Sequence, residues 1–79
     1  MAWGKTIYET HIYTARGELI KLKVQKLYET GEWVVRHFQN GKYIEDYSYF
    51  TDDRKDALMS SDQMALHLRG KLGHILKYN

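Results

Sequence analysis

Histidine is the residue type in this chain best suited to metal binding, and four histidines are present with no cysteine. Their spacing does not match a metal-ligand motif such as H-E-x-x-H. His67 and His74 would lie on one face of a helix, but Lys71 lies between them and would repel a cation. The sequence therefore predicts no metal site and no cofactor.

Serine and aspartate side chains, which could serve as nucleophiles or general acids, gather where helices are expected to begin. Ser60 and Ser61 are typical helix-capping residues, and the aspartates between residues 52 and 62 suit the positive end of a helix dipole. These structural roles explain the residues better than catalysis does. There is no phosphate-binding glycine loop, and a chain of 79 residues has little room for a ligand pocket. We therefore predict that the protein is not an enzyme and has no small-molecule substrate.

The remaining chemistry is that of aromatic and basic side chains, which strands would have to position. With 43% hydrophobic residues, the chain is predicted to form a single domain over residues 1–79. Residues 1–50 are rich in aromatic and β-branched residues between glycines, which is typical of an antiparallel meander. The expected strands are Lys5–Thr14, Leu19–Tyr28, Glu32–Gln39 and Lys42–Phe50. Asn40-Gly41 predicts a two-residue type I′ turn between the last two strands.

The rest of the chain is predicted to be helical. Thr51 is expected to cap a short helical turn over residues 51–59, and the capping-box spacing of Ser60 and Gln63 begins a main helix over residues 60–79. Apolar residues recur there at helical intervals: Met64, Ala65, Leu68, Leu72, Ile75 and Leu76. The predicted fold class is α+β, a four-stranded antiparallel meander sheet with a C-terminal helix packed on one face.

Strand register predicts which face of the sheet the helix covers. The turn at residues 40–41 should place Phe38 opposite Tyr43 and, further along, Val34 opposite Tyr47. A two-residue turn before the third strand aligns the apolar side chains of the second strand with the tryptophan side of the third, whereas a three-residue turn would invert the second strand. The predicted core is Ile20, Leu22, Val24, Trp33, Val35, Ile44 and Phe50.

The uncovered sheet face is predicted to be basic on one side, aromatic on the other, and to be the binding surface. Its candidate binding residues are Lys21, Lys23, Arg36, Phe38, Tyr43, Tyr47 and Tyr49. Tyrosine and arginine are enriched at protein-interface hot spots, whereas stacked aromatics beside lysine and arginine suit single-stranded nucleic acid. The residue types do not choose between these partners, and tyrosines also favour strands without any binding role.

One segment carries a family resemblance. The run GEWVVRHFQNGKYIEDYSYFTDDRKDA, residues 31–57, resembles the W-x-V, N-G-K, F-T, A pattern of sheet-plus-helix domains such as the AP2 family and phage integrase arm-binding domains. The resemblance implies these scaffold positions: Trp33, Val35, Asn40, Gly41 and Phe50. It also implies an open sheet face that enters a DNA groove, with Arg36 and Tyr47 on the DNA-facing side. In size and element order the chain also looks like small phage-encoded inhibitors, anti-CRISPR proteins among them.

Overall charge and hydropathy define the expected partner and compartment. A net charge of +2 permits an anionic partner without the strongly basic footprint of a nucleic-acid binder. No apolar run is long enough for a membrane span, and the lack of cysteine fits a reducing compartment, so we expect a cytoplasmic protein with no membrane partner. We predict a protein-binding module, an inhibitor or adaptor, with a small DNA- or RNA-binding domain as the alternative. The outer helix face, with Leu66, Gly70 and Gly73, could form a homodimer contact.

Overall fold

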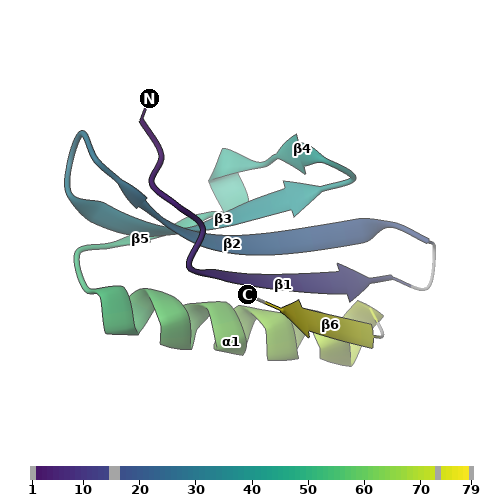
Figure 1. The fold of residues 1–79 in the computed structure, drawn as a ribbon. Helices are drawn as coiled ribbons and strands as arrows, with labels where there is room; N and C mark the ends of the chain where they lie inside the picture. Colours follow the sequence, from purple (N-terminus) through teal and green to yellow (C-terminus); the bar gives the residue numbers. More distant parts are fainter. Residues whose placement is uncertain (1, 15–16, 73, 79) are drawn as a thin grey trace.

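An antiparallel sheet with one helix packed across one face makes up the structure (Figure 1). The computed structural model describes residues 2–14, 17–72 and 74–78, with side chains up to residue 68. The elements are β1 (Tyr8–Tyr13), β2 (Leu19–Leu27), β3 (Glu32–Gln39), β4 (Lys42–Tyr43), the 3₁₀ helix η1 (Glu45–Tyr47), β5 (Tyr49–Thr51), α1 (Arg54–Leu72) and β6 (His74–Tyr78). The predicted α+β class and the antiparallel sheet are confirmed.

The strands lie in the order β4-β3-β2-β1-β6, and β5 pairs with β3 alongside β4. β5 pairs with the first half of β3, whereas β4 pairs with its last residues. In Figure 1 α1 runs below the sheet, and the N-terminal segment reaches β1 from the side away from α1. The two faces of the sheet are therefore covered by different elements.

The turn between β3 and β4 has the predicted form. Asn40 and Gly41 have positive φ values of 52° and 84°, as a type I′ turn requires, and Phe38 pairs with Tyr43. The side-chain amide of Asn40 also accepts a hydrogen bond from the Leu19 backbone at 3.0 Å. Local turn chemistry therefore sets this part of the register.

The loop between β2 and β3 is longer than predicted. Leu27 pairs with Glu32, so residues 28–31 form a four-residue loop, closed by a 2.9 Å hydrogen bond from the Gly31 amide to the Leu27 carbonyl. The register therefore differs by two residues from the prediction. A shift of two keeps every side chain on its predicted face, because side chains alternate along a strand.

The predicted fourth strand is broken in the middle, and this changes the face of its second half. η1 separates β4 from β5, so Val34 pairs with Phe50 rather than with Tyr47. The amide and hydroxyl of Ser48 close the η1 turn by donating to backbone carbonyls at its start, at 2.9 and 3.2 Å. A continuous strand would have placed Asp46 on the helix-covered face, whereas η1 leaves it exposed. The shift of three residues turns β5 over.

The predicted short turn and main helix are one continuous helix, α1. Asp53 caps it: its carboxylate accepts a hydrogen bond from the Lys55 amide and its carbonyl accepts one from the Ala57 amide, each at 3.0 Å. Neither Thr51 nor Ser60 therefore begins the helix. Because Asp53 satisfies the first free amides, the chain has no reason to restart a helix at Ser60.

The prediction that the helix continues to residue 79 is wrong beyond Leu72. β6 follows and pairs with β1, so that Ile75 lies opposite Ile12 and Leu76 opposite His11. The glycines near the helix end lower its helical stability, whereas a strand at this point satisfies the backbone groups along the edge of β1. The spacing of these apolar residues is compatible with one face of a helix, but the residues form a strand.

The core lies between the sheet and α1. Its buried residues are Ile12, Ile20, Leu22, Val24, Val35, Ala57 and Ala65. The predicted core residues of β2, and Val35, are confirmed, and Trp33, Met64 and Leu68 pack against them partly buried. Two predicted members are wrong, since Ile44 is only partly buried and lies outside the core, and Phe50 is 37% exposed on the opposite face. Of the two helix residues in the core, Ala65 belongs to the predicted helical stripe, whereas Ala57 was not among the predicted core residues.

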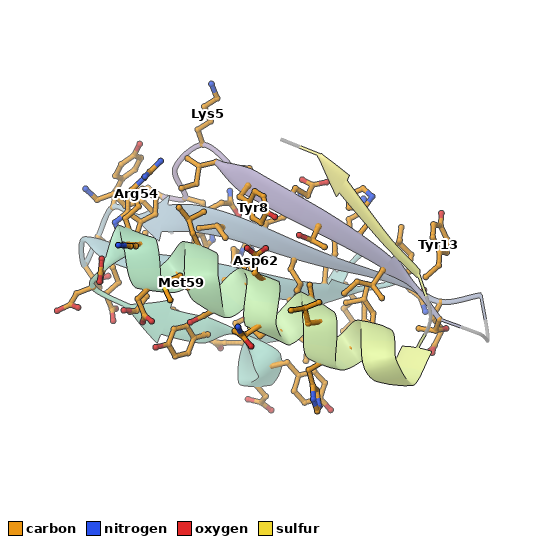
Figure 2. All side chains as sticks on the ribbon, turned by 90° about the horizontal axis from the view of Figure 1, so that it is seen from below. Lys5, Tyr8, Tyr13, Arg54, Met59 and Asp62 are labelled. Atoms are coloured by element: carbon orange, nitrogen blue, oxygen red, sulfur yellow. The ribbon has the colours of Figure 1, made fainter. Side chains whose placement is uncertain are left out.

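Two tyrosine hydroxyls hold α1 over the sheet. Figure 2 shows Tyr8 of β1 near Asp62 of α1, and the Tyr8 hydroxyl donates to the Asp62 carboxylate at 2.9 Å. The hydroxyl of Tyr49 on β5 donates to the Asp56 carboxylate in the first turns of α1, at 2.7 Å. These bonds place the start of α1 near β5 and its middle near β1.

Candidate functional site

Five of the predicted binding residues lie together on the sheet face opposite α1, named the open face below. They are Lys21, Lys23, Arg36, Phe38 and Tyr43. Lys21 lies beside Phe38 on the neighbouring strand, and Tyr43 lies on the other side of Phe38. Lys23 lies beside Arg36. The register therefore brings three basic groups next to two aromatic rings.

Arg36 is the centre of an aromatic stack on this face. The carbon of its guanidinium is 4.0 Å from the ring centre of Trp3 and 4.3 Å from that of Tyr43. The ring centre of Phe38 is 4.9 Å away. Arg36 Nη1 donates a hydrogen bond to Gln25 Oε1 at 3.0 Å, whereas its buried Nε has no partner among the described residues. Cation–π contacts between the guanidinium and the rings therefore provide much of the stabilisation of this stack.

The segment before β1 covers one end of the open face, and the sequence analysis missed it. Trp3 pairs with Leu27 of β2, and the Gly4 amide donates to the Lys26 carbonyl at 2.7 Å. A side chain at Gly4 would meet this carbonyl oxygen at 3.2 Å, so glycine permits the close approach. Leu27 and Val34, at this end of the open face, are buried. The available signal was the Trp3-Gly4 pair, since glycine often marks a close backbone approach.

The β1 side of the open face carries negative charge. Lys23 Nζ is 5.2 Å from the Phe38 ring centre and 4.0 Å from Glu9 Oε1, and its side chain is 31% exposed. Glu9 also pairs with His11 Nε2. The positive charge of the open face is therefore partly balanced on the β1 side and is strongest along β2 and β3.

Tyr47 and Tyr49 do not lie on the open face, which corrects the prediction for both. Tyr47 belongs to η1, and its ring meets that of His37 edge to face, with ring centres 5.2 Å apart. Tyr49 pairs with Val35, whose side chain is in the core under α1. The hydrogen bond between Tyr49 and Asp56 raises the pKa of Tyr49 and lowers the pKa of Asp56. Both tyrosines face the helix side because the fourth strand is interrupted.

The remaining predicted features were placed as follows. Leu66 is 54% exposed on the outer side of α1 and Gly70 lies in the same helix, whereas Gly73 is outside the described residues. Within the described residues, no group of three or more His, Cys, Asp or Glu side chains is arranged to hold a metal ion. In that part of the chain, no helix has the length and apolar character needed to cross a membrane.

Comparison of the chain with protein-family models, curated proteins and solved structures found no match. The resemblances to AP2-type and integrase arm-binding domains and to small phage-encoded inhibitors therefore stay predictions. The function has to be argued from the geometry of the molecule.

Proposed function

We propose that this protein is a non-enzymatic protein-binding module that acts as an inhibitor or adaptor through its open face. The observation that supports the proposal is the Arg36 stack, a half-buried group of rings around one guanidinium, bordered by Lys21 and Lys23. Arginine and aromatic residues carry much of the binding energy at protein interfaces, where a packed centre is surrounded by a polar rim. The open face has this arrangement.

The stack favours a protein partner over single-stranded nucleic acid. A nucleotide base binds by stacking on an aromatic face that is free to receive it. Here the guanidinium of Arg36 already lies against the ring of Trp3 and close to two others. The net charge of +2 also supplies little of the electrostatic attraction on which phosphate binding depends.

The charges define the chemistry of the partner surface. Lys21 and Lys23 project beside the aromatic rings of the open face, on the strand next to Phe38. A complementary surface would carry carboxylates around an apolar side chain that packs on Phe38 and Tyr43. The partner is therefore expected to be an acidic protein with an apolar contact at the centre of its binding site.

Affinity capture with matched charge variants tests this proposal. Lys21→Glu combined with Lys23→Glu reverses both lysine charges of the open face. The control, Lys42→Glu combined with Lys55→Glu, makes the same change in net charge at exposed positions away from that face. From a nuclease-treated lysate, the wild type and the control are expected to retain the same protein, and the open-face variant is expected to lose it.

Calorimetry with the captured protein then gives the size of the effect. Two charge reversals at the rim of the stack are expected to weaken binding about a hundredfold, and the control should bind like the wild type. Equal binding by both variants would refute the open face as the binding surface. If capture occurs from an untreated lysate but not after nuclease treatment, and binding depends steeply on salt, nucleic acid is instead established as the ligand.

A further inference from the structure

A cavity of about 670 Å³ lies on the helix side of the sheet, opposite the open face. Ile20 of β2 and His37 of β3 line it from the sheet, Met64 and Leu68 line it from α1, and Tyr47 of η1 lines it at the edge. Its volume falls in the range of sites that bind small molecules. The prediction that so small a chain has little room for a ligand pocket did not anticipate this cavity.

The cavity follows from the path of the chain. β4 ends after two residues and η1 separates it from β5, so neither strand pairs with Arg36 and His37 of β3. Tyr47 is 60% exposed, and its side chain forms one wall of the cavity. Met64 and Leu68 remain only partly buried although they lie on the core-facing side of α1. These side chains therefore leave apolar surface available in the cavity.

One residue that lines the cavity, His37, carries a buried polar group. His37 is 5% exposed, and its Nε2 is buried with no hydrogen-bond partner among the described residues. Buried polar groups in proteins are almost always paired, so an unpaired ring nitrogen in a cavity calls for a partner. Burial, the larger effect, lowers the pKa of His37, and the neighbouring Gln39 side chain raises it in part, so the uncharged imidazole is favoured at neutral pH.

The charges around the cavity favour an uncharged ligand. Of the described lining residues, Glu18 is the one acidic side chain, and its carboxylate accepts a 3.3 Å hydrogen bond from the Gln39 amide. His67 lies at the exposed rim. An anion would meet Glu18 without a lysine or arginine among these residues to pair with, and a cation would meet mainly apolar surface.

We infer that this cavity binds a small, uncharged aromatic molecule with one hydrogen-bonding group, which packs against Tyr47, Met64 and Leu68 and pairs with His37 Nε2 after a small turn of the His37 ring exposes that buried atom. The rings of His37 and Tyr47 already meet edge to face, inclined by 80°, so aromatic contact is favoured at this position. The site is on the other side of the sheet from the open face, so it stands or falls independently of the proposed protein partner.

Phenol and benzene are the matched probes for this site, because they differ only in a hydroxyl group. In two-dimensional amide NMR titrations, phenol is expected to shift the signals of Ile20, Met64 and Leu68 saturably, with a dissociation constant of about 1 mM. Benzene should bind about tenfold more weakly, because it cannot pair with His37. His37→Phe keeps a ring in place and should reduce phenol binding to the level of benzene.

Tryptophan substitutions on two sides of α1 provide the controls. Leu68→Trp fills the cavity and should abolish phenol binding, whereas Leu66→Trp, on the exposed outer side, should leave it unchanged. If Leu68→Trp does not fold, Gln63→Trp at the exposed rim of the cavity replaces it. No saturable shift up to 20 mM phenol, concentrations about twentyfold above the expected constant, would overturn the inference. Unchanged binding in the filled variants, or equal binding of phenol and benzene, would overturn it as well.

Discussion

Arg36 and His37 are neighbours on β3, but their side chains lie on opposite faces of the sheet and have different surroundings. Arg36 lies against three aromatic rings and donates a hydrogen bond to Gln25. His37 has the ring of Tyr47 beside it, and its Nε2 has no partner among the described residues. The N-terminal segment lies over the first site, whereas η1 only borders the second. The same strand therefore presents a filled site on one face and an unfilled one on the other.

This difference separates two kinds of binding. The rings around Arg36 are held by contacts with one another, so the open face presents a preordered surface, and preorder lowers the entropic cost of binding a large partner. The cavity beside His37 keeps apolar surface and an unpaired nitrogen, which suit a small ligand that can enter it. The following experiments test whether the two faces differ in this way, beginning with the largest expected effect.

Leucine truncations on the two faces should both be costly if the N-terminal segment covers the open face. Leu22, under α1, is fully buried, and Leu27, beside Trp3, is 5% exposed. We expect Leu22→Ala to lower the free energy of unfolding by about 3 kcal/mol and Leu27→Ala by about 2 kcal/mol, measured by urea denaturation. Leu66→Ala, at an exposed position, should cost less than about 0.5 kcal/mol. A cost at Leu27 as small as that at Leu66 would show that this end of the open face is uncovered.

Removal of Trp3 should open the filled site. Trp3→Ala loses the ring that lies closest to the Arg36 guanidinium and the pairing partner of Leu27, so we expect a loss of about 2 kcal/mol. In a double-mutant cycle with Arg36→Ala, the coupling between the two residues should be about 1 kcal/mol. Purely additive losses would mean that the stack contributes no energy of its own.

The unfilled site should make stability depend on pH through His37. Burial lowers the pKa of His37 below the ordinary 6.5, so the unfolded chain takes up this proton more readily than the folded protein does. The stability linked to His37 is therefore complete above about pH 6.5 and is lost as the pH falls below it. In urea denaturation from pH 7.5 to pH 5, His37→Gln should lose less stability than the wild type. Identical pH slopes for the two proteins would contradict the burial of an uncharged imidazole.

The smallest effect is expected where α1 meets β5. Tyr49→Phe removes the hydrogen bond from the Tyr49 hydroxyl to Asp56. In the wild type this bond lowers the pKa of the Asp56 carboxyl. The stability that this hydrogen bond contributes is present above the unfolded pKa of Asp56, 3.8, and is lost as the pH falls through the lower pKa of the folded protein. Both groups are solvent-exposed, so the variant should be only slightly less stable at pH 7 and equal to the wild type at acidic pH, by thermal unfolding. A difference in stability between variant and wild type that persists at acidic pH would show that Tyr49 acts through packing and not through this hydrogen bond.

Short-range chemistry made the central part of the sheet predictable. Asn40-Gly41 can take positive φ at both positions, so the turn and the pairing of Phe38 with Tyr43 follow from neighbouring residues. The faces of β2 and β3 were also predicted correctly although the loop between them has four residues rather than two, because an even shift preserves side-chain alternation. The open-face basic residues were therefore located from the sequence.

Competition between distant segments made the rest unpredictable. Residues 74–78 have apolar spacing compatible with a helix, but the edge of β1 pairs with them as β6. Ser48 closes η1 with hydrogen bonds that compete with strand pairing, and this moves Tyr47 and Tyr49 to the helix side. A tertiary contact, the pairing with β1, therefore decided the first of these, whereas the hydrogen bonds of Ser48 to residues 44 and 45 decided the second.

The sequence by itself determined the α+β class, the type I′ turn, and the sides of the sheet on which β2 and β3 place their apolar and basic residues, because these depend on periodicity and on backbone preferences of adjacent residues. Only the tertiary structure decided that Trp3 lies over Arg36 and that Tyr47 lies beside His37. Each of these contacts joins segments that are far apart in the sequence, or that are separated by a turn whose length the sequence does not determine. Their geometry depends on packing and hydrogen bonding of the whole chain, which local patterns do not encode.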